Sequence, residues 1–329
     1  MGILVKGQLF IEKRLIMNQN AGSIEKEIVK GEFVRQGDHF RDWVMADSSS
    51  EYVAEPDRYH LYVSLACPWA HRTIIARKLK GLESIIGMTV VDPIRDERGW
   101  KFFEDTDDVC GFKFLRDAYE ATETNYDARV TVPALWDCVR KRIVNNSEVD
   151  IVRMFDSSFD EWANDTIDLY PDNQRSEMER LENFVYEKIN NGVYRAGFAK
   201  TQATYESAVF NLFEALDTVE KHLSKQRFLC GETITAVDWN LFVTLVRFDC
   251  VYYHHFKCNQ RRIMDYSHLW GYLRELFQYP GIAETVDFSQ IKQHYFTTQT
   301  HINPHGIIPV GPREIDFSIP HGRELVPNS

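Results

Sequence analysis

The sequence lacks several features that define particular protein classes. It has no uninterrupted apolar run of roughly 18 residues, the length of a membrane-spanning helix, so we expect no membrane insertion. The first residues, MGILVKGQLFIEKRL, carry charges that interrupt any signal-peptide core, and no small-residue cleavage site follows, so we expect no secretory signal. The formal net charge of −11 leaves no positive excess for nucleic acid or an anionic membrane, and we expect neither partner.

Cysteine is also sparse, and its arrangement disfavours two kinds of site. No Cys-x-x-Cys pair occurs, which disfavours a thioredoxin-type dithiol. Scattered cysteines in a chain of 329 residues without a signal are typical of reduced thiols, so we expect a cytoplasmic protein. His254, His255 and Cys258 lie close together, but a fourth ligand at suitable spacing is absent, so we expect no metal. The six cysteines are Cys67, Cys110, Cys138, Cys230, Cys250 and Cys258.

What the sequence does contain is the composition of an ordinary globular protein, with 44% hydrophobic and 26% charged residues. Its length predicts two domains. We divide it into an N-terminal extension (residues 1–57), a first domain (58–156), a polar and acidic linker (157–174), and a second domain with a C-terminal extension (175–329). Aromatic residues reach 13%, enough to build a site for a flat ring-shaped ligand, although most would serve the core.

The clearest local pattern is a strand that runs into a cysteine and then into a helix. In RYHLYVSLA, alternate side chains from Tyr59 to Leu65 fall on one face, and the residue types favour a strand. Cys67 and Pro68 follow, and proline is well suited to the first turn of a helix. The helix that they begin is predicted to stop at Gly81.

The later elements complete a predicted fold. We expect a second strand over residues 84–91, two strands over 130–136 and 142–146 that are close enough for a hairpin, and a helix over 146–155. A parallel β-α-β unit followed by an antiparallel pair and a helix is the thioredoxin-type arrangement. Residues 175–329 have helical periodicity. The prediction is therefore an α/β thioredoxin-like N-terminal domain followed by an all-α C-terminal domain.

The position of Cys67 has a chemical consequence. A thiol at a helix N-terminus faces unpaired N–H groups and the positive end of the helix dipole, which lower its pKa to roughly 3.5–7.5. The alternative, a small buried apolar residue, is disfavoured by the strand–helix context. Ala70 occupies the place where a thioredoxin-type motif has its second cysteine. An external thiol must therefore release whatever Cys67 captures, and glutathione is the obvious candidate.

The run Thr131-Val132-Pro133 is a second candidate for substrate binding. Proline cannot donate to a central strand ladder, so it marks an edge or a turn. In thioredoxin-like folds such a proline is cis, and the residue before it offers its backbone to a peptide-like substrate. Because X–Pro bonds are usually trans, the sequence leaves the isomer of Pro133 open.

Several stretches are distinctive when they are taken together: YHLYVSLACPWAHR (59–72), RVTVPALWD (129–137), NNGVYRAGFA (190–199), LVRFD (245–249), and HYF (294–296) with INPHGIIPVGP (302–312). They resemble the glutathionyl-hydroquinone reductases, which are the Xi class of glutathione transferases. The resemblance covers the chain from about residue 51 onward. It implies a glutathione transferase fold, glutathione as co-substrate, a glutathionylated aromatic substrate and a homodimer.

The resemblance also implies a reaction. The Cys67 thiolate attacks the sulfur of a glutathionyl-hydroquinone and releases hydroquinone, and a second glutathione resolves the mixed disulfide. Tyr194 is implied as proton donor and acceptor, Tyr252 as the residue that lowers the cysteine pKa, and Tyr295 as stabiliser of the bound hydroquinone. Without the resemblance, each tyrosine would be interpreted as core. The implied glutathione contacts are Trp100, Arg129, Val130, Thr131, Val132, Ser147 and Glu148.

Two positions differ from the family pattern. The family usually has Glu-Ser where this chain has Ser147-Glu148, at a helix N-terminus that favours a carboxylate. The exchange turns each side chain by about 100° around the helix. These residues would bind the γ-glutamyl end of glutathione. The exchange leaves three possibilities open: other contacts restore this binding, the binding is weaker, or the site suits a related small thiol. In addition, Cys250 replaces a proline that precedes the Val-Tyr pair, which bears on the position of Tyr252.

Two other functions stay open at this point. An omega-like thioltransferase or dehydroascorbate reductase would share the cysteine chemistry but not the three tyrosines. A non-catalytic binding module with a transferase fold is disfavoured by the intact Cys67 and its aromatic partners. The natural quinone and the dimer geometry cannot be inferred from the residues.

Overall fold

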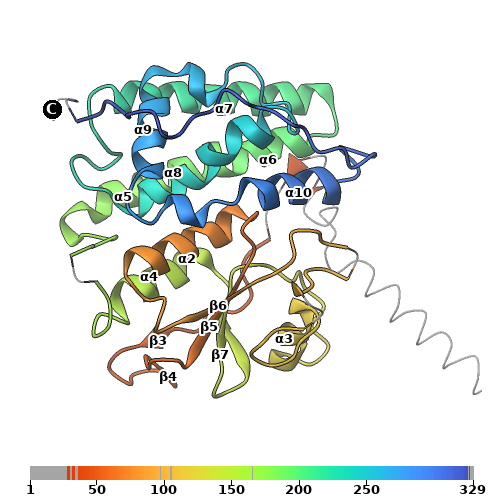
Figure 1. The fold of residues 1–329 in the computed structure, drawn as a ribbon, viewed down its shortest axis with the longest axis vertical. Coiled ribbons are helices and arrows are strands. Elements are labelled where there is room, and N and C mark those ends of the chain that lie inside the picture. Colours follow the sequence, from red (N-terminus) through yellow and green to blue (C-terminus); the bar gives the residue numbers. More distant parts are fainter. Residues whose placement is uncertain are drawn as a thin grey trace, which may run out of the picture.

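The computed structural model describes residues 28–29, 32–33, 36–96, 98–103, 106–164, 166–324 and 326. A mixed sheet with its helices forms one part of the molecule, and a helical region covers one side of it (Figure 1). The C-terminal segment that follows α10 (Phe288–Thr298) lies along the helical region as far as residue 324. Within the ranges described, the structure has no helix that is both long and apolar enough to cross a membrane.

A four-stranded sheet organises the first part, with the strand order β6-β5-β7-β8. The inner strand β5 (Tyr59–Val63) pairs in parallel with β6 (Gly87–Val90) and antiparallel with β7 (Ala134–Asp137). The edge strand β8 (Arg142–Asn145) pairs antiparallel with β7. This pairing confirms the predicted parallel β-α-β unit and antiparallel hairpin. Strand β7 is buried throughout, because helices or loops cover both faces of the sheet.

Three helices accompany the sheet. Helices α2 (Pro68–Leu79) and α4 (Glu148–Ser157) pack against each other on the side that faces the helical region (Figure 1). Helix α3 (Leu115–Thr122) lies against β8. No element was predicted between the strands over residues 84–91 and 130–136, where this helix lies. This helix has only two turns and buries few residues, which is too little periodicity to identify it from the sequence.

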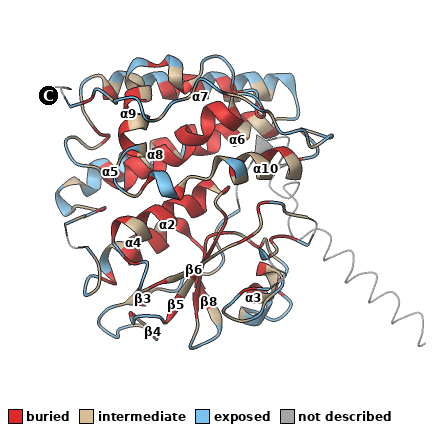
Figure 2. Cartoon of the chain, viewed as in Figure 1, coloured by how far each residue is buried: buried red, intermediate tan, exposed pale blue. Residues whose placement is uncertain are grey.

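The remaining helices form the second part and confirm its predicted all-α character. Helix α8 (Ala236–Arg247) is buried along its whole length, and it contacts both α2 and α5 (Arg175–Val185). The buried ribbon in Figure 2 is concentrated on α8, α6 and α2, so the core is continuous between the two parts. The other elements are η3 (Asp172–Gln174), η4 (Tyr186–Asn190), α6 (Asn191–Phe198), α7 (Gln202–Leu223), η5 (Phe248–Tyr252), η6 (Ile263–Asp265), α9 (Ser267–Phe277), η7 (Ala283–Thr285) and α10 (Phe288–Thr298).

Part of the predicted N-terminal extension packs on the sheet region. Strands β3 (Val44–Met45) and β4 (Tyr52–Val53) form a parallel pair, and the Asp42 N–H donates to the Val144 carbonyl over 3.1 Å. Further upstream, β1 (Ile28–Val29) and β2 (Glu32–Phe33) pair antiparallel. Residues 1–27 of the extension lie outside the described residues.

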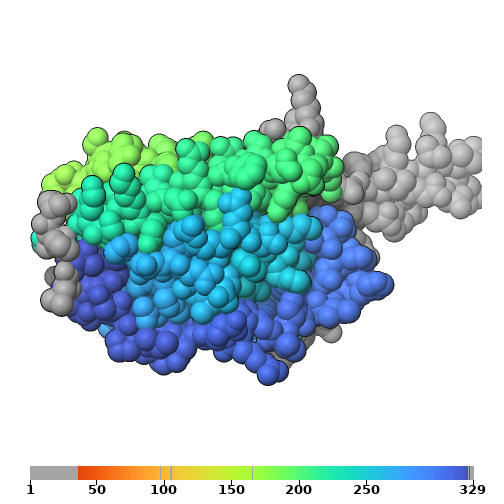
Figure 3. Space-filling view, turned by 90° about the horizontal axis from the view of Figure 1, so that it is seen from above, coloured from red at the N-terminus to blue at the C-terminus, as the bar shows by residue number. Residues whose placement is uncertain are grey.

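The face of the molecule on the helical side is drawn in Figure 3. It consists of the helices from α5 onward and of the C-terminal residues, which follow one edge of that face. The C-terminal segment is attached to α9 by Arg274, whose Nη1 donates to the Pro320 carbonyl over 2.9 Å. The sheet region lies on the other side of this helical layer (Figure 1).

Candidate active site

Cys67 is the N-cap residue of α2, as the sequence predicts. Its carbonyl accepts the first helical hydrogen bond, from the His71 N–H over 3.0 Å, and Pro68 occupies the first turn. The side chain is partly buried, and Sγ lies 3.6 Å from the carbonyl oxygen of Val132. The first N–H groups of a helix have no intrahelical acceptor, so they favour an anion at this place. The thiol is therefore located where a helix begins, on a side chain that is only partly buried.

The other five cysteines have a different environment. Burial raises the pKa of Cys230 to about 11 and that of Cys250 to about 12, and it raises the pKa of Cys258 further. Burial also raises the pKa values of Cys110 and Cys138. A raised thiol pKa leaves little thiolate at neutral pH, which makes these residues poor nucleophiles.

The segment from Arg129 to Pro133 runs past the nucleophile. The Val132–Pro133 peptide bond is cis, the isomer that the sequence left open. Thr131 is held on both sides, because its carbonyl accepts from the Tyr119 hydroxyl over 2.8 Å and its Oγ1 accepts from Asn146 Nδ2 over 3.1 Å. Val130 and Val132 are buried side chains, so the backbone of this segment is fixed beside Cys67.

Trp100 and Arg129 were predicted as glutathione contacts from separate parts of the chain. Trp100 is buried and stacks on His294 of α10, with ring centroids 5.0 Å apart. The Arg95 guanidinium lies 5.4 Å from the centre of the same indole. Arg129 and Arg95 both act electrostatically on His294 and help burial to lower its pKa to about 4. Two arginines thus lie around a neutral imidazole near the site.

Ser147 and Glu148 begin helix α4, and both are buried. Ser147 is the N-cap residue, and its N–H donates to Asn145 Oδ1 over 2.7 Å. The Glu148 carboxylate lies 3.4 Å from Nη1 of Arg72, which is a buried ion pair. In this order of the two residues, the carboxylate contacts α2, and the serine occupies the end of the helix.

The three predicted tyrosines meet, although 101 residues separate the first from the last. The hydroxyl of Tyr295 on α10 is 2.5 Å from that of Tyr194 on α6 and 3.0 Å from that of Tyr252 in η5. Trp69, two residues after the nucleophile, packs on the Tyr194 ring with centroids 4.9 Å apart. The cluster therefore lies next to the beginning of α2.

Burial determines the ionisation of these phenols. It raises the pKa of Tyr252 to about 12 and raises the pKa values of Tyr194 and Tyr295 well above their usual value. A negative charge at Cys67 acts in the same direction on Tyr194. All three hydroxyls are therefore protonated at neutral pH and can donate hydrogen bonds or protons to a ligand.

This arrangement combines the parts that thiol transfer requires. A sulfur at a helix N-terminus can attack a thioether or disulfide sulfur. A fixed strand segment beside it can bind a peptide-like thiol. Neutral phenols in a dry environment can protonate a leaving group.

Arg247 and His71 lie beside the nucleophile but were not predicted as site residues. Arg247 ends α8 and is fully buried, and it contacts the chain just before Cys67. The run LVRFD drew attention only as a whole, because no pattern in the sequence distinguishes a buried arginine from one on the surface.

The predicted absence of a metal remains a prediction. Of the residues that the structure describes, no group of three or more His, Cys, Asp or Glu side chains could hold a metal ion. His255, one of the residues considered, pairs with Gln299 over 2.9 Å.

Comparison with known proteins identifies the family. The model of the glutathione S-transferase N-terminal domain matches residues 66–158, and that of the C-terminal domain matches residues 202–275. Glutathionyl-hydroquinone reductase YqjG of Escherichia coli is 46% identical over 306 residues, which cover 90% of this chain and 93% of that protein. A glutathione S-transferase omega-like 2 of Schizosaccharomyces pombe is 44% identical, over 86% of this chain and 94% of that protein.

Solved structures agree with the sequence matches. The glutathione-bound structure of Escherichia coli YqjG has a TM-score of 0.85 at 46% identity, covering 87% of this chain and 96% of that one. A Xi-class glutathione transferase from Natrialba magadii has a TM-score of 0.84 at 48% identity, covering 86% of this chain and 88% of that one. This chain belongs to the glutathionyl-hydroquinone reductases, the Xi class of the glutathione transferase family.

Proposed function

We propose that this enzyme reduces glutathionyl-hydroquinones to hydroquinones with glutathione as the reductant. In the first step the Cys67 thiolate attacks the glutathione sulfur. The bond from sulfur to the ring carbon breaks, a Cys67–glutathione disulfide forms, and the ring carbon takes up a proton. In the second step the thiolate of another glutathione attacks that disulfide, releasing oxidised glutathione and the Cys67 thiolate. Glutathione supplies both electrons, so no metal or other cofactor is needed.

The observation that carries this proposal is the position of Cys67 between two fixed elements. Its sulfur is at the N-terminus of α2 and 3.6 Å from the Val132 carbonyl, and the phenol cluster lies on the other side of Trp69. A substrate that combines a peptide-like thiol with a hydroxylated ring has two parts, and each part suits one of these elements.

Each of the three tyrosines has a different proposed role in the reaction. Tyr194 is the proposed proton donor to the ring carbon, because burial keeps its hydroxyl protonated. Tyr295 contacts both other hydroxyls, so it is proposed to bind the hydroquinone oxygen and to align Tyr194. Tyr252 is proposed to lower the pKa of the Cys67 thiol by hydrogen bonding when substrate is absent.

The remaining predicted residues are proposed to bind glutathione. The Val132 backbone would pair with the cysteinyl amide, and Arg129 would bind a carboxylate. Trp100, Val130 and Thr131 would form the wall of this subsite. Ser147 and Glu148 would bind the γ-glutamyl end, with Ser147 at the helix terminus as the direct contact, because Glu148 is paired with Arg72.

The test is turnover of a synthetic glutathionyl-hydroquinone with excess glutathione, measured as hydroquinone released. We expect activity in the wild type and in Cys138→Ser, a control that removes a partly exposed thiol from the β7–β8 turn. Cys67→Ser should lose turnover. Full activity in Cys67→Ser would refute the proposed mechanism.

A second candidate function follows from the omega-like name of the Schizosaccharomyces pombe relative. An omega-like thioltransferase or dehydroascorbate reductase would use Cys67 but would not need a proton donor to carbon. Dehydroascorbate is therefore assayed beside the glutathionyl-hydroquinone. Activity on dehydroascorbate alone would favour this second function. Failure of oxidised glutathione to modify Cys67 at all would favour a binding module.

We also propose a cytoplasmic homodimer. The six free thiols support a reducing compartment. Light scattering of the purified chain gives the oligomeric state, and a monomeric mass at micromolar concentration would contradict the dimer.

A further inference from the structure

A buried cation lies behind the nucleophile. Arg247 ends helix α8 of the helical region, and its side chain is 0% exposed. Its Nε donates to the Ala66 carbonyl over 3.0 Å, and its Nη2 donates to the Leu65 carbonyl over 2.9 Å. These are the two residues immediately before Cys67. The helical region therefore holds the loop from which the nucleophile projects.

The other contacts of Arg247 are equally specific. Nη1 donates to the Val243 carbonyl over 2.8 Å and to Nδ1 of His71 over 3.0 Å. Because a guanidinium only donates, Nδ1 of His71 must be the acceptor, and the imidazole proton is on Nε2. That nitrogen donates to Thr285 Oγ1 over 2.7 Å, and this hydroxyl donates to the Ile282 carbonyl over 2.7 Å. Every partner in this chain of hydrogen bonds is electrically neutral.

Among the residues that the structure describes, no carboxylate lies within ion-pair distance of Arg247, which sets it apart from comparable arginines. Four arginines are buried in the ranges that the structure describes, and a guanidinium carries its charge at any pH that proteins tolerate. Three of them have a carboxylate within ion-pair distance, whereas Arg247 has only carbonyls and a neutral imidazole. The three pairs are Arg58 with Asp137 at 2.8 Å, Arg72 with Glu148 at 3.4 Å and Arg323 with Glu275 at 3.4 Å.

A buried charge without a counter-ion is costly, so an anion close to it is favoured. The positive charge already affects neighbouring groups. It opposes protonation of His71, whose pKa is well below its usual value mainly because of burial. It also counteracts the effect of burial on the Tyr252 and Tyr295 phenols. In the proposed reaction the group that becomes an anion here is the Cys67 thiol, and Cys67 directly follows the two residues whose carbonyls Arg247 binds.

We propose that Arg247 is the positioning residue of Cys67, and that its guanidinium both fixes the loop before the nucleophile and serves as the counter-charge of the thiolate. The inference rests on the proposed role of Cys67 as nucleophile. It adds a fixed positive charge to the two other proposed sources of thiolate stabilisation, the N-terminus of α2 and the hydrogen bond from Tyr252. Loss of this charge should therefore change the ionisation of the thiol even if the fold is kept.

The titration must be attributed to the right group. The titratable and charged side chains packed around Cys67 and Arg247 come from several elements. Each of them can also affect the measured pKa of the Cys67 thiol. They are His71 of α2, Tyr194 of α6, Cys250 and Tyr252 of η5, His294 and Tyr295 of α10, and the arginines Arg95 and Arg129 of the loops. The histidines are neutral and the phenols protonated near pH 7, so Arg95, Arg129 and Arg247 are the fixed charges.

The experiment is the pH dependence of Cys67 alkylation by iodoacetamide, followed by intact mass in the full chain, with Cys67→Ser as the blank. Arg247→Gln keeps donors for the carbonyls but removes the charge, and we expect the thiol pKa to rise by at least about 1 pH unit. Arg247→Lys keeps the charge but cannot bond both carbonyls at once, so the thiol pKa should stay near the wild-type value while kcat falls. A wild-type pKa in folded Arg247→Gln would overturn the proposal.

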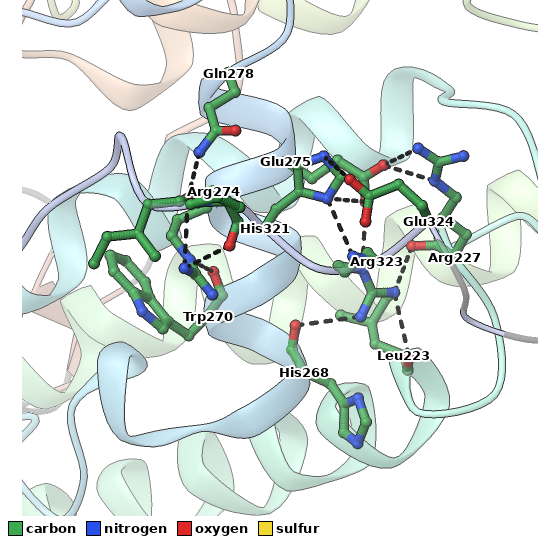
Figure 4. Close-up of polar contacts among 12 residues, drawn as sticks. Leu223, Arg227, His268, Trp270, Arg274, Glu275, Gln278, His321, Arg323 and Glu324 are labelled. Atoms are coloured by element: carbon green, nitrogen blue, oxygen red, sulfur yellow. Dashed lines mark hydrogen bonds and ion pairs between the residues drawn. The ribbon is translucent and has the colours of Figure 1, made fainter.

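A matched control separates charge from general disruption. Arg323 is also buried and donates to the backbone carbonyls of Leu223 and Arg227 (Figure 4) and of Gln226. Arg323→Gln should lower stability and leave the Cys67 titration unchanged. An equal rise of the thiol pKa in this control would overturn the proposal.

Two outcomes need separate interpretation: an Arg247→Gln variant that does not fold, and a wild type that is inactive on the hydroquinone substrate. If Arg247→Gln does not fold, Arg247→Lys decides, because a thiol pKa as high as that of an ordinary cysteine would contradict the role of the charge. Alkylation requires no hydroquinone, so an inactive wild type with an Arg247-dependent thiol would refute the proposed function and leave this inference intact.

Discussion

Replacement of Tyr194 by phenylalanine distinguishes a role of this residue in proton donation from a role in folding stability. The change removes one hydroxyl that has a hydrogen bond of 2.5 Å to Tyr295. Loss of one such bond reduces the free energy of unfolding by about 0.5–1.5 kcal/mol. Loss of a general acid reduces kcat by about 10²–10⁴-fold. These magnitudes differ enough that a catalytic effect cannot be mistaken for partial unfolding.

The assay compares two reactions of the same variant. Hydroquinone release needs a proton on the ring carbon and should fall by about 10²–10⁴-fold. Modification of Cys67 by oxidised glutathione releases a thiolate and needs no such proton, so its rate should stay within about threefold of the wild type. An unchanged rate of Cys67 modification by oxidised glutathione would show that the nucleophile is intact in the variant.

Tyr59→Phe is the matched control for this prediction. Tyr59 is a buried tyrosine at the start of β5, and its hydroxyl donates one hydrogen bond, to the Val53 carbonyl over 2.7 Å. Its removal should cost about the same stability and leave turnover unchanged. The reasoning is refuted if Tyr194→Phe retains wild-type turnover, or if both reactions of Cys67 decline equally.

The structure supports further predictions. Asp137→Asn should lower the free energy of unfolding in urea by about 3 kcal/mol, because it removes the buried carboxylate of Arg58 and leaves only the more distant, exposed Glu55; an unchanged midpoint would contradict this. Gly197→Ala would place a Cβ 2.3 Å from ring atoms of Phe256, which packs on Tyr194. The melting temperature and the turnover should therefore both fall, and a wild-type melting temperature would contradict this prediction. Burial lowers the pKa values of His60, His255 and His294 to about 4, so unfolding titrations should show stability that is complete above pH 6.5 and declines towards pH 4; a flat profile there would exclude neutral buried histidines.

The sequence predicted the elements around the nucleophile because local rules determine them. Alternation identified β5, and a proline after Cys67 with a glycine after the helix delimited α2. The predicted helix over 146–155 is observed as α4, Glu148–Ser157. In these segments, propensity, periodicity and burial all favour the same structure.

Other parts of the site depend on contacts between distant residues. Nothing in the spacing of Tyr194, Tyr252 and Tyr295 predicts that their hydroxyls meet, and only the family resemblance drew attention to them. Arg247 was missed for the same reason, since its partners Leu65 and Ala66 lie more than 180 residues away. Tertiary packing, rather than local pattern, creates these groups.

The exchange of Ser147 and Glu148 has a structural consequence that the sequence left open. Glu148 is directed to Arg72, so its carboxylate is engaged within the protein. We expect the Michaelis constant for glutathione, rather than the rate of the chemical step, to reflect this difference from the family pattern.

The most direct test of the account is a single turnover of the glutathionyl-hydroquinone by enzyme in excess, without added glutathione, quenched in acid and followed by intact mass and peptide mapping. We predict one hydroquinone released for each glutathione that becomes attached to Cys67, with equal rates for the two events. Hydroquinone released without glutathione on Cys67, or glutathione attached at another cysteine, would contradict it.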